Sequence, residues 1–224
     1  MANAAAGAVQ ELSTLITSTS EGLDSNLAAL KSDVQAKSSG QPMLAMVFGQ
    51  VLGMAQQAVN GAKASLSSVQ GMLPGISGAW QIEAVAEQAR SAASDAESYA
   101  SQVQPQNLAS RQSWSSAASQ DFTTRANQHA DAAQKAAERA RRLADRLGAL
   151  SATATSSAAQ VVTNLSTAVT TIAERSASLV QVESAIGAIG PLGSASANLT
   201  TAKNDGETTL KNAATAGSDD PGGV

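Results

Sequence analysis

A stripe of apolar and small residues with a seven-residue repeat constrains this chain more than any other feature. Between Phe122 and Leu150 its positions recur in alternating steps of four and three, the spacing of a coiled-coil seam. The predicted seam consists of Phe122, Ala126, His129, Ala133, Ala136, Ala140, Leu143, Leu147 and Leu150. Because its middle is alanine, each residue buries little apolar area, so the partner helix has to approach closely and the contact has to be long.

Similar apolar periodicities predict further long helices on both sides of the seam. We expect these helices over residues 3–37, 42–73, 77–103 and 156–189. Breaks between helices are predicted at Ser38–Pro42, Pro74–Gly78, Pro105, Gly148–Ser157 and Ile189–Gly193, where Gly, Pro or Ser interrupts the pattern. The soft apolar residues of the second helix, Met43, Met46, Phe48 and Met54, are interpreted as core residues.

Together these patterns predict an all-α fold. The expected architecture is an elongated antiparallel bundle of four to five long helices with coiled-coil-like packing over residues 1–189. It comprises an N-terminal hairpin (3–73), a second hairpin (77–150) and an extra helix (156–189). Residues 190–224, rich in Gly, Ser, Thr and Asp, are expected to form a largely disordered tail, in which one short helix around Leu199–Ala214 is open.

Composition argues against several classes of function. A net charge of -4 offers no general attraction for nucleic acid, and the absence of cysteine excludes disulfides and thiolate chemistry. The N-terminal residues lack the basic and apolar regions of a signal peptide, which predicts a protein that is cytoplasmic or secreted without a cleaved signal peptide. The apolar segment Met43–Ala55 is shorter than the roughly 20 residues that span a bilayer, so no stable membrane span is expected.

Residues with catalytic or metal-binding potential are few. His129 is the only histidine, and His129-Ala-Asp131 supplies at most one pair of metal ligands, so we expect no metal site and no cofactor. No phosphate-binding loop or nucleophile motif is present, and no catalytic residue can be nominated. The sequence therefore favours a non-enzymatic protein.

Trp114 and Phe122 lie eight positions apart, between the predicted helix 77–103 and the seam. With the small residues Ser115 and Ser116 they resemble the turn of the WXG helical-hairpin proteins of type VII (ESX) secretion, although Ser116 replaces the glycine of the family motif. The resemblance implies that Trp114, Ser116 and Phe122 form the turn and anchor of a hairpin. It also implies a single-chain four-helix bundle, in which the N-terminal hairpin replaces a second chain as in paired PE and PPE proteins.

The leading functional expectation follows from this resemblance: a non-enzymatic secreted substrate or structural component of a type VII-like system, which acts through helix packing. Its partners would be proteins of the secretion system, and self-assembly into a homo-oligomer through alanine-lined faces is open. Two alternatives remain: a cytoplasmic coiled-coil scaffold or signalling hairpin, and a pore-forming secretion translocator that inserts Met43–Ala55 into lipid.

Overall fold

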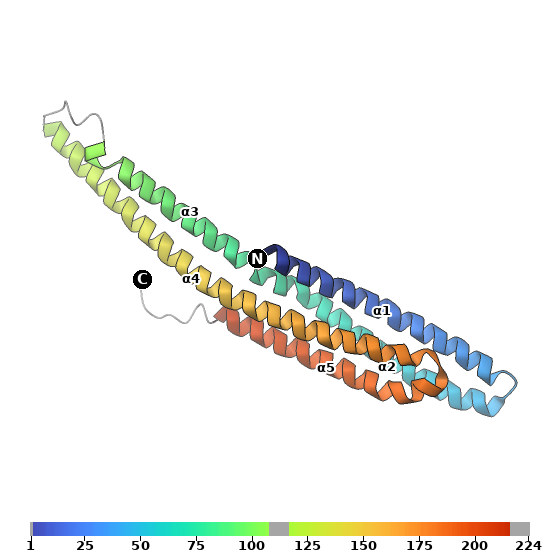
Figure 1. The fold of residues 1–224 in the computed structure, drawn as a ribbon. Coiled ribbons are helices and arrows are strands. Elements are labelled where there is room, and N and C mark those ends of the chain that lie inside the picture. Colours follow the sequence, from blue (N-terminus) through green and yellow to red (C-terminus); the bar gives the residue numbers. More distant parts are fainter. Residues whose placement is uncertain (1, 108–116, 216–224) are drawn as a thin grey trace. The chain divides into compact units, whose positions relative to one another are not determined.

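The computed structural model describes residues 2–107 and 117–215, and every regular element in these two ranges is a helix. The all-α prediction is confirmed. The elements are α1 (Ala2–Ser38), α2 (Pro42–Ala79), α3 (Gln81–Gln102), the 3₁₀ helix η1 (Pro105–Asn107), α4 (Ala117–Ser176), the 3₁₀ helix η3 (Ala177–Val180) and α5 (Val182–Thr215) (Figure 1). They divide into two compact units: a four-helix unit (Met1–Ala79 and Ala154–Thr215) and a hairpin unit (Trp80–Thr153).

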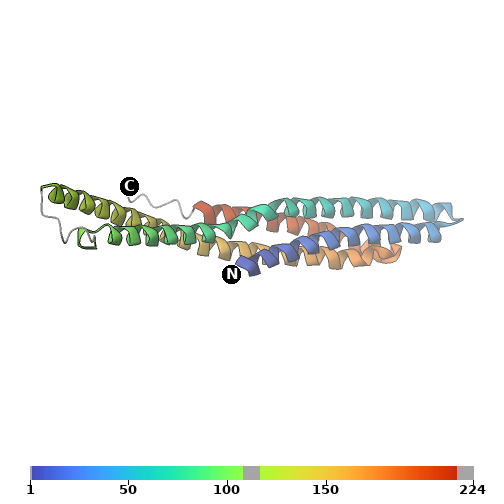
Figure 2. The same cartoon turned by 90° about the horizontal axis from the view of Figure 1, so that it is seen from above.

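The four-helix unit consists of two antiparallel hairpins. Helices α1 and α2 lie side by side (Figures 1 and 2), and Gly40 supplies the positive φ of 75° that their tight turn requires. The end of α4 and helix α5 form the second hairpin through η3. The hairpins meet through hydroxyl and amide contacts: Ser65 Oγ lies 2.9 Å from Ser196 Oγ, and Asn26 Nδ2 donates to the carbonyl oxygen of Ser176 at 3.1 Å.

Large aliphatic side chains fill the core of the four-helix unit. Its largest fully buried residues are Leu12, Ile16, Leu23, Leu30, Val59, Leu66, Ile76, Leu165, Ile172, Leu179, Leu192 and Leu199. On α1 these residues recur in steps of four, seven and seven, the spacing of one amphipathic helix face. Full burial of side chains of this size makes the hydrophobic effect the main stabilising contribution in this unit.

A small polar network joins the end of α1 to the start of α5. The backbone N–H of Val182 donates to Asp33 Oδ2 at 2.9 Å, so a side chain of α1 caps α5. Lys37 Nζ lies 2.6 Å from Glu183 Oε2 and 3.1 Å from Asp33 Oδ2. The hydrogen bond from Val182 and then Lys37 lower the pKa of Asp33. Hydrogen bonds to Glu183 and then to Asp33 raise the pKa of Lys37, and Lys37 in turn lowers the pKa of Glu183.

The hairpin unit is built almost entirely on alanine. Helix α3 and the α4 segment up to Thr153 lie antiparallel (Figures 1 and 2), with Ala86, Ala93 and Ala100 buried at intervals of seven residues on α3. The buried residues of α4 in this unit are Ala126, Ala130, Ala137, Ala144 and Ser151. Across the seam Arg141 forms an ion pair with Glu97. The guanidinium of Arg90 covers Gly148, where an added Cβ would lie 3.1 Å from Nη2.

Several predicted boundaries are wrong because proline and glycine do not end helices here. Helix α2 continues through Pro74 to Ala79, so the predicted break at Pro74–Gly78 and the helix start at Ser77 are incorrect. The bond lost at Pro74 is offset by burial of the neighbouring Leu73 and Ile76. Helix α4 likewise runs without interruption across Gly148–Ser157.

The predicted disordered tail from residue 190 is wrong for residues 190–215, which belong to α5. The short helix left open around Leu199–Ala214 is part of this longer helix. The predicted extra helix 156–189 is also incorrect, because the chain turns at η3 and α5 passes through Pro191. Helix α5 buries small residues as well as leucines, including Ala195, Gly206 and Ala213, and a count of large apolar residues misses such a face. Residues 216–224 lie outside the described residues.

The arrangement of the hairpins differs from the expected one. A four-helix unit forms, but the N-terminal hairpin shares it with residues 154–215, whereas the resemblance assigned this role to residues 77–150. The second predicted hairpin corresponds to the hairpin unit, within the error of its boundaries.

Candidate functional site

Of the three residues predicted to form the turn and anchor of the WXG-like hairpin, the structure describes one, Phe122. Trp114 and Ser116 lie outside the described residues. Phe122 lies on α4, where 40% of its surface is exposed. The predicted role of Phe122 in the turn and anchor of the hairpin stays a prediction.

The predicted seam is correct at one set of positions and shifted by one residue at the other. Ala126 is buried, and Ala133, Ala140, Leu147 and Leu150 are half-buried. The prediction is wrong for Phe122, His129, Ala136 and Leu143, which are exposed. The buried residues that take their place are Ala130, Ala137 and Ala144.

The shift has a steric reason. At one turn of the seam the choice lies between Leu143, which is 53% exposed, and Ala144, which is 1% exposed. A hydrophobicity criterion prefers leucine, but the facing residues of α3 are alanines, and two helices lined by alanine pack closely only if both present small side chains. Small side-chain size, rather than hydrophobicity, therefore determines which residues of α4 are buried in the seam.

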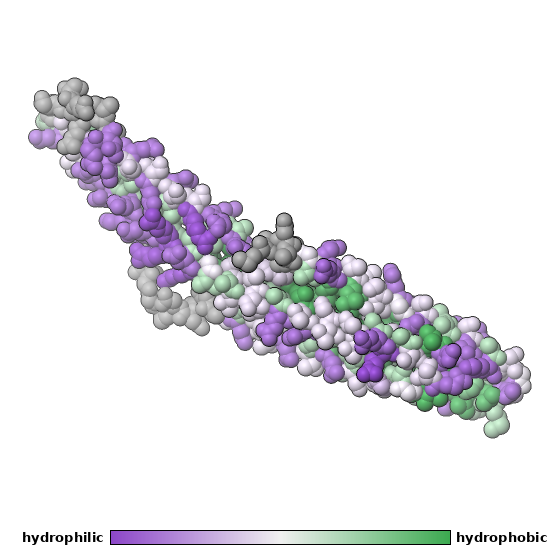
Figure 3. All heavy atoms as spheres, in the orientation of Figure 1, coloured by the Kyte–Doolittle hydropathy of each residue, from purple (hydrophilic) through white to green (hydrophobic). Residues whose placement is uncertain are grey.

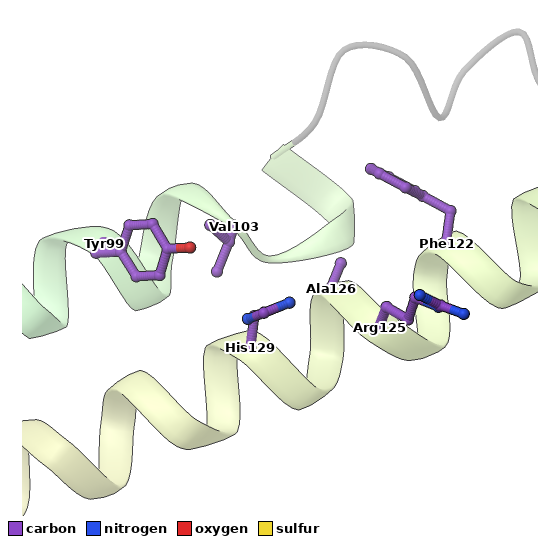
Figure 4. A pocket seen from close by; sticks show the side chains of 6 residues that line it. All are labelled: Tyr99, Val103, Phe122, Arg125, Ala126 and His129. Carbon is purple, nitrogen blue, oxygen red and sulfur yellow. The ribbon is translucent and has the colours of Figure 1, made fainter.

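A groove of about 330 Å³ lies between α3 and α4 in the hairpin unit (Figure 4). Its lining consists of Tyr99 from α3, of Val103 directly after the end of α3, and of Phe122, Arg125, Ala126 and His129 from α4. Figure 4 shows Val103 facing α4, with Ala126 and His129 projecting toward α3 and the Phe122 ring at one end. The small side chain of Ala126 leaves the space that the larger residues surround.

The ionisable lining of the groove is basic apart from the phenol of Tyr99. None of the described residues that line it is acidic. Within residues 2–107 and 117–215, neither the guanidinium of Arg125 nor the imidazole of His129 has an ion-pair or hydrogen-bond partner, and both side chains are exposed. The groove therefore combines an apolar floor with two unpaired nitrogen-bearing groups that can donate hydrogen bonds.

Sequence reasoning named Phe122, Ala126 and His129 but placed them on a seam, and it missed the contribution of Tyr99, Val103 and Arg125. One signal was present: the only tyrosine, the only histidine and one of two phenylalanines line the same groove. The register between α3 and α4 brings them together, and no residue of either helix alone specifies that register.

A second exposed surface, which we term the α2 outer face, comprises Met43, Met46, Val47 and Met54. Met43 is 84% and Met46 71% exposed, so their interpretation as core residues is wrong; Met54 is also exposed, while Phe48 is half-buried. Figure 3 shows hydrophobic residues gathered near the end of the α1–α2 hairpin. No ionisable side chain occurs between Ser38 and Ala62.

The α2 outer face is separate from the buried face of the same helix. Val51, Ala55 and Val59 point into the four-helix unit, about a third of a turn around the helix from Met43 and Met54 at roughly 100° per residue. Helix α2 thus carries two apolar faces, of which its own unit covers one.

Among the described residues, no group of three or more His, Cys, Asp or Glu side chains is arranged to hold a metal ion. The helices within these residues do not reach the length and apolarity needed to cross a membrane. No protein-family model matches the chain, and neither a curated protein nor a solved structure shows significant similarity to it.

Proposed function

We propose that the protein is a non-enzymatic helical assembly component that binds protein partners through the α2 outer face. The observation that carries this proposal is the exposure of Met43 and Met46 on a segment without a single charge. Large apolar side chains grouped on a surface are costly in water unless a partner covers them. Depletion of charge with enrichment of methionine is characteristic of the centre of protein interfaces.

A partner helix fits this face better than a globular surface does. Gly49 and Gly53 lie one turn apart next to Met46, and an added Cβ at either position would meet no atom within 4 Å. The backbone of a second helix can therefore approach closely beside the methionines, whose flexible side chains adapt to its shape.

We further propose a type VII-like secretion system as the setting, with the protein as a secreted substrate or structural component. Support comes from the resemblance of Trp114, Ser116 and Phe122 to the WXG turn and from the antiparallel pairing of α3 with α4 on either side of that segment. The α2 outer face would then contact another protein of the system.

Secretion by a host with a type VII system tests two parts of the proposal together: the type VII-like setting and the role of the α2 outer face. The tagged full chain is expected in the culture supernatant of the competent host but not of a host that lacks the secretion ATPase. Met46→Glu places a charge on the α2 outer face and is expected to reduce export without changing the melting temperature. Gln56→Glu adds the same charge on an exposed position of α2 outside the face and should leave export unchanged.

Three other results would redirect the proposal. Equal retention of the protein in the cytosol of both hosts would remove the type VII setting and favour the cytoplasmic scaffold. Export that Met46→Glu and Gln56→Glu change equally would remove the α2 outer face from the account. Leakage of neutral liposomes by the wild type but not by Met46→Glu would favour the pore-forming translocator instead.

A further inference from the structure

The groove between α3 and α4 has the properties of a small-molecule site, and its argument is independent of the proposed assembly function. Its volume of about 330 Å³ falls at the lower end of the range of ligand pockets, about 300–1,000 Å³. Its floor is formed by Val103 and Ala126, and the rings of Tyr99 and Phe122 stand at its rim (Figure 4). Such a site suits a compact, flat, apolar molecule, since aromatic rims favour stacking or edge contacts.

Charge decides which kind of apolar molecule the groove accepts. Arg125 and His129 lie one helical turn apart on α4, and both belong to the lining. In the described residues the guanidinium has no carboxylate partner, although Asp121 lies one turn before it on the same helix. The planar guanidinium donates two parallel hydrogen bonds to a carboxylate, and the opposite charges make these bonds stronger than those to a neutral acceptor.

We propose that this groove binds a small aromatic carboxylate. The ring of the ligand lies on Ala126 and Val103 between Tyr99 and Phe122, and its carboxylate accepts hydrogen bonds from Arg125, with the imidazole of His129 as a further donor. A cationic ligand is disfavoured because the lining residues within 2–107 and 117–215 include no acidic side chain. A purely apolar ligand would accept no hydrogen bond from Arg125 or His129.

The single histidine makes the test direct. Because His129 is the only histidine, the full-length protein has one imidazole Hε1 signal in its proton NMR spectrum, and that signal reports the groove. Titration at pH 7 with 2-naphthoate is expected to shift it in a saturable manner. The neutral analogue 2-naphthamide, of the same shape, is expected to bind about tenfold more weakly because it lacks the charge-assisted hydrogen bonds.

Matched arginine variants locate the carboxylate contact. Arg125→Gln is expected to weaken 2-naphthoate binding by about tenfold, with an unchanged circular dichroism spectrum because the side chain is exposed. Arg139→Gln makes the same charge change at an exposed position of α4 outside the groove and should leave binding unchanged.

Three outcomes would overturn the proposal. The first is an unshifted His129 signal at millimolar 2-naphthoate. The second is an equal affinity for 2-naphthoate and 2-naphthamide, which would indicate apolar adsorption alone. The third is an equal loss of affinity in Arg125→Gln and Arg139→Gln, which would indicate a general charge effect.

Discussion

The four-helix unit and the hairpin unit use the same seven-residue repeat but bury side chains of different size. In the four-helix unit the repeat places leucine, isoleucine and valine at fully buried positions, for example Leu30, Leu66 and Leu165. In the hairpin unit the corresponding positions are alanines such as Ala93 and Ala137. The seven-residue repeat therefore determines the geometry of a helix pair, and the size of the buried side chains determines its stability.

The difference in stabilisation is large per residue. A leucine has three more carbon atoms than an alanine, so at about 0.8 kcal/mol per buried CH₂ each alanine position gives up roughly 2 kcal/mol. A two-helix contact also covers each helix on one side only. We therefore expect the hairpin unit to open far more readily than the four-helix unit.

Truncation of a buried leucine should produce the largest effect. Leu165→Ala in the four-helix unit is expected to lower the free energy of unfolding by about 2–5 kcal/mol, because Leu165 is fully buried and its removal leaves a cavity. Leu143→Ala on the same helix, at an exposed position of the hairpin unit, should change it by less than about 0.5 kcal/mol. Urea denaturation measures both, and equal losses would contradict the comparison.

Close packing around glycine in α5 provides the next test. A Cβ on Gly206 would lie 2.8 Å from Val161 Cγ1 and 3.1 Å from Met72 Cε, so Gly206→Ala should destabilise the four-helix unit by about 1–3 kcal/mol. Gly193, also within α5, has no atom within 4 Å of an added Cβ. Gly193→Ala should stabilise the protein by up to about 1 kcal/mol through helix propensity. A stabilising Gly206→Ala would show that the helices do not approach this closely.

A pair of neighbouring alanines tests the register of the hairpin seam. Ala137 is 1% exposed and Ala136 is exposed, so Ala137→Leu should overpack the seam, at a cost of about 1–3 kcal/mol, while Ala136→Leu is tolerated. Hydrogen exchange of α3 peptides should become faster in Ala137→Leu only. Faster exchange in Ala136→Leu instead would restore the register predicted from the sequence.

The smallest effect is expected at the exposed polar network of the four-helix unit. The Val182 N–H and then Lys37 lower the pKa of Asp33, and Lys37 lowers the pKa of Glu183. The contribution of Lys37 to stability is therefore present above the ordinary carboxyl values of about 4 and is lost as the pH falls through the lower folded-state values. The raised pKa of Lys37 means that the same contribution is lost at the alkaline end, as the pH rises through that value.

Lys37→Met should therefore lower the melting temperature at pH 7 and by less at an acidic pH, because the contribution of Lys37 is lost as the pH falls through the lowered pKa values of Asp33 and Glu183. Lys31→Met, at an exposed position one to two turns earlier on α1, serves as the control and should have no effect at either pH. A pH-independent loss in Lys37→Met would assign the effect to packing of the alkyl chain.

The features that sequence predicts well are those with large side chains at regular spacing. Leu12, Ile16, Leu23 and Leu30 mark the buried face of α1, and the helix ends where Gly40 turns the chain. Prediction failed at Pro74 and Pro191, because burial of Leu73 and Leu192 on neighbouring positions offsets the local cost of proline. Such compensation depends on tertiary contacts that no local pattern contains.

The groove and the seam register were harder to predict for a related reason. Alanines at 136 and 137 offer two nearly equivalent stripes, and only the close approach of Ala93 and its neighbours on α3 favours one of them. The meeting of Tyr99 with His129 depends on that same register. Both follow from how two helices pair, whereas sequence periodicity describes each helix separately.

Native-state hydrogen exchange measured by mass spectrometry tests the central claim most directly. Peptides from α1, α2 and α5 are expected to exchange only through global unfolding. Peptides from α3 and from residues 117–153 of α4 should exchange at least about tenfold faster, which corresponds to ~1.4 kcal/mol less opening free energy. Equal protection of the two sets would contradict the claim that alanine packing leaves the hairpin unit the weaker of the two.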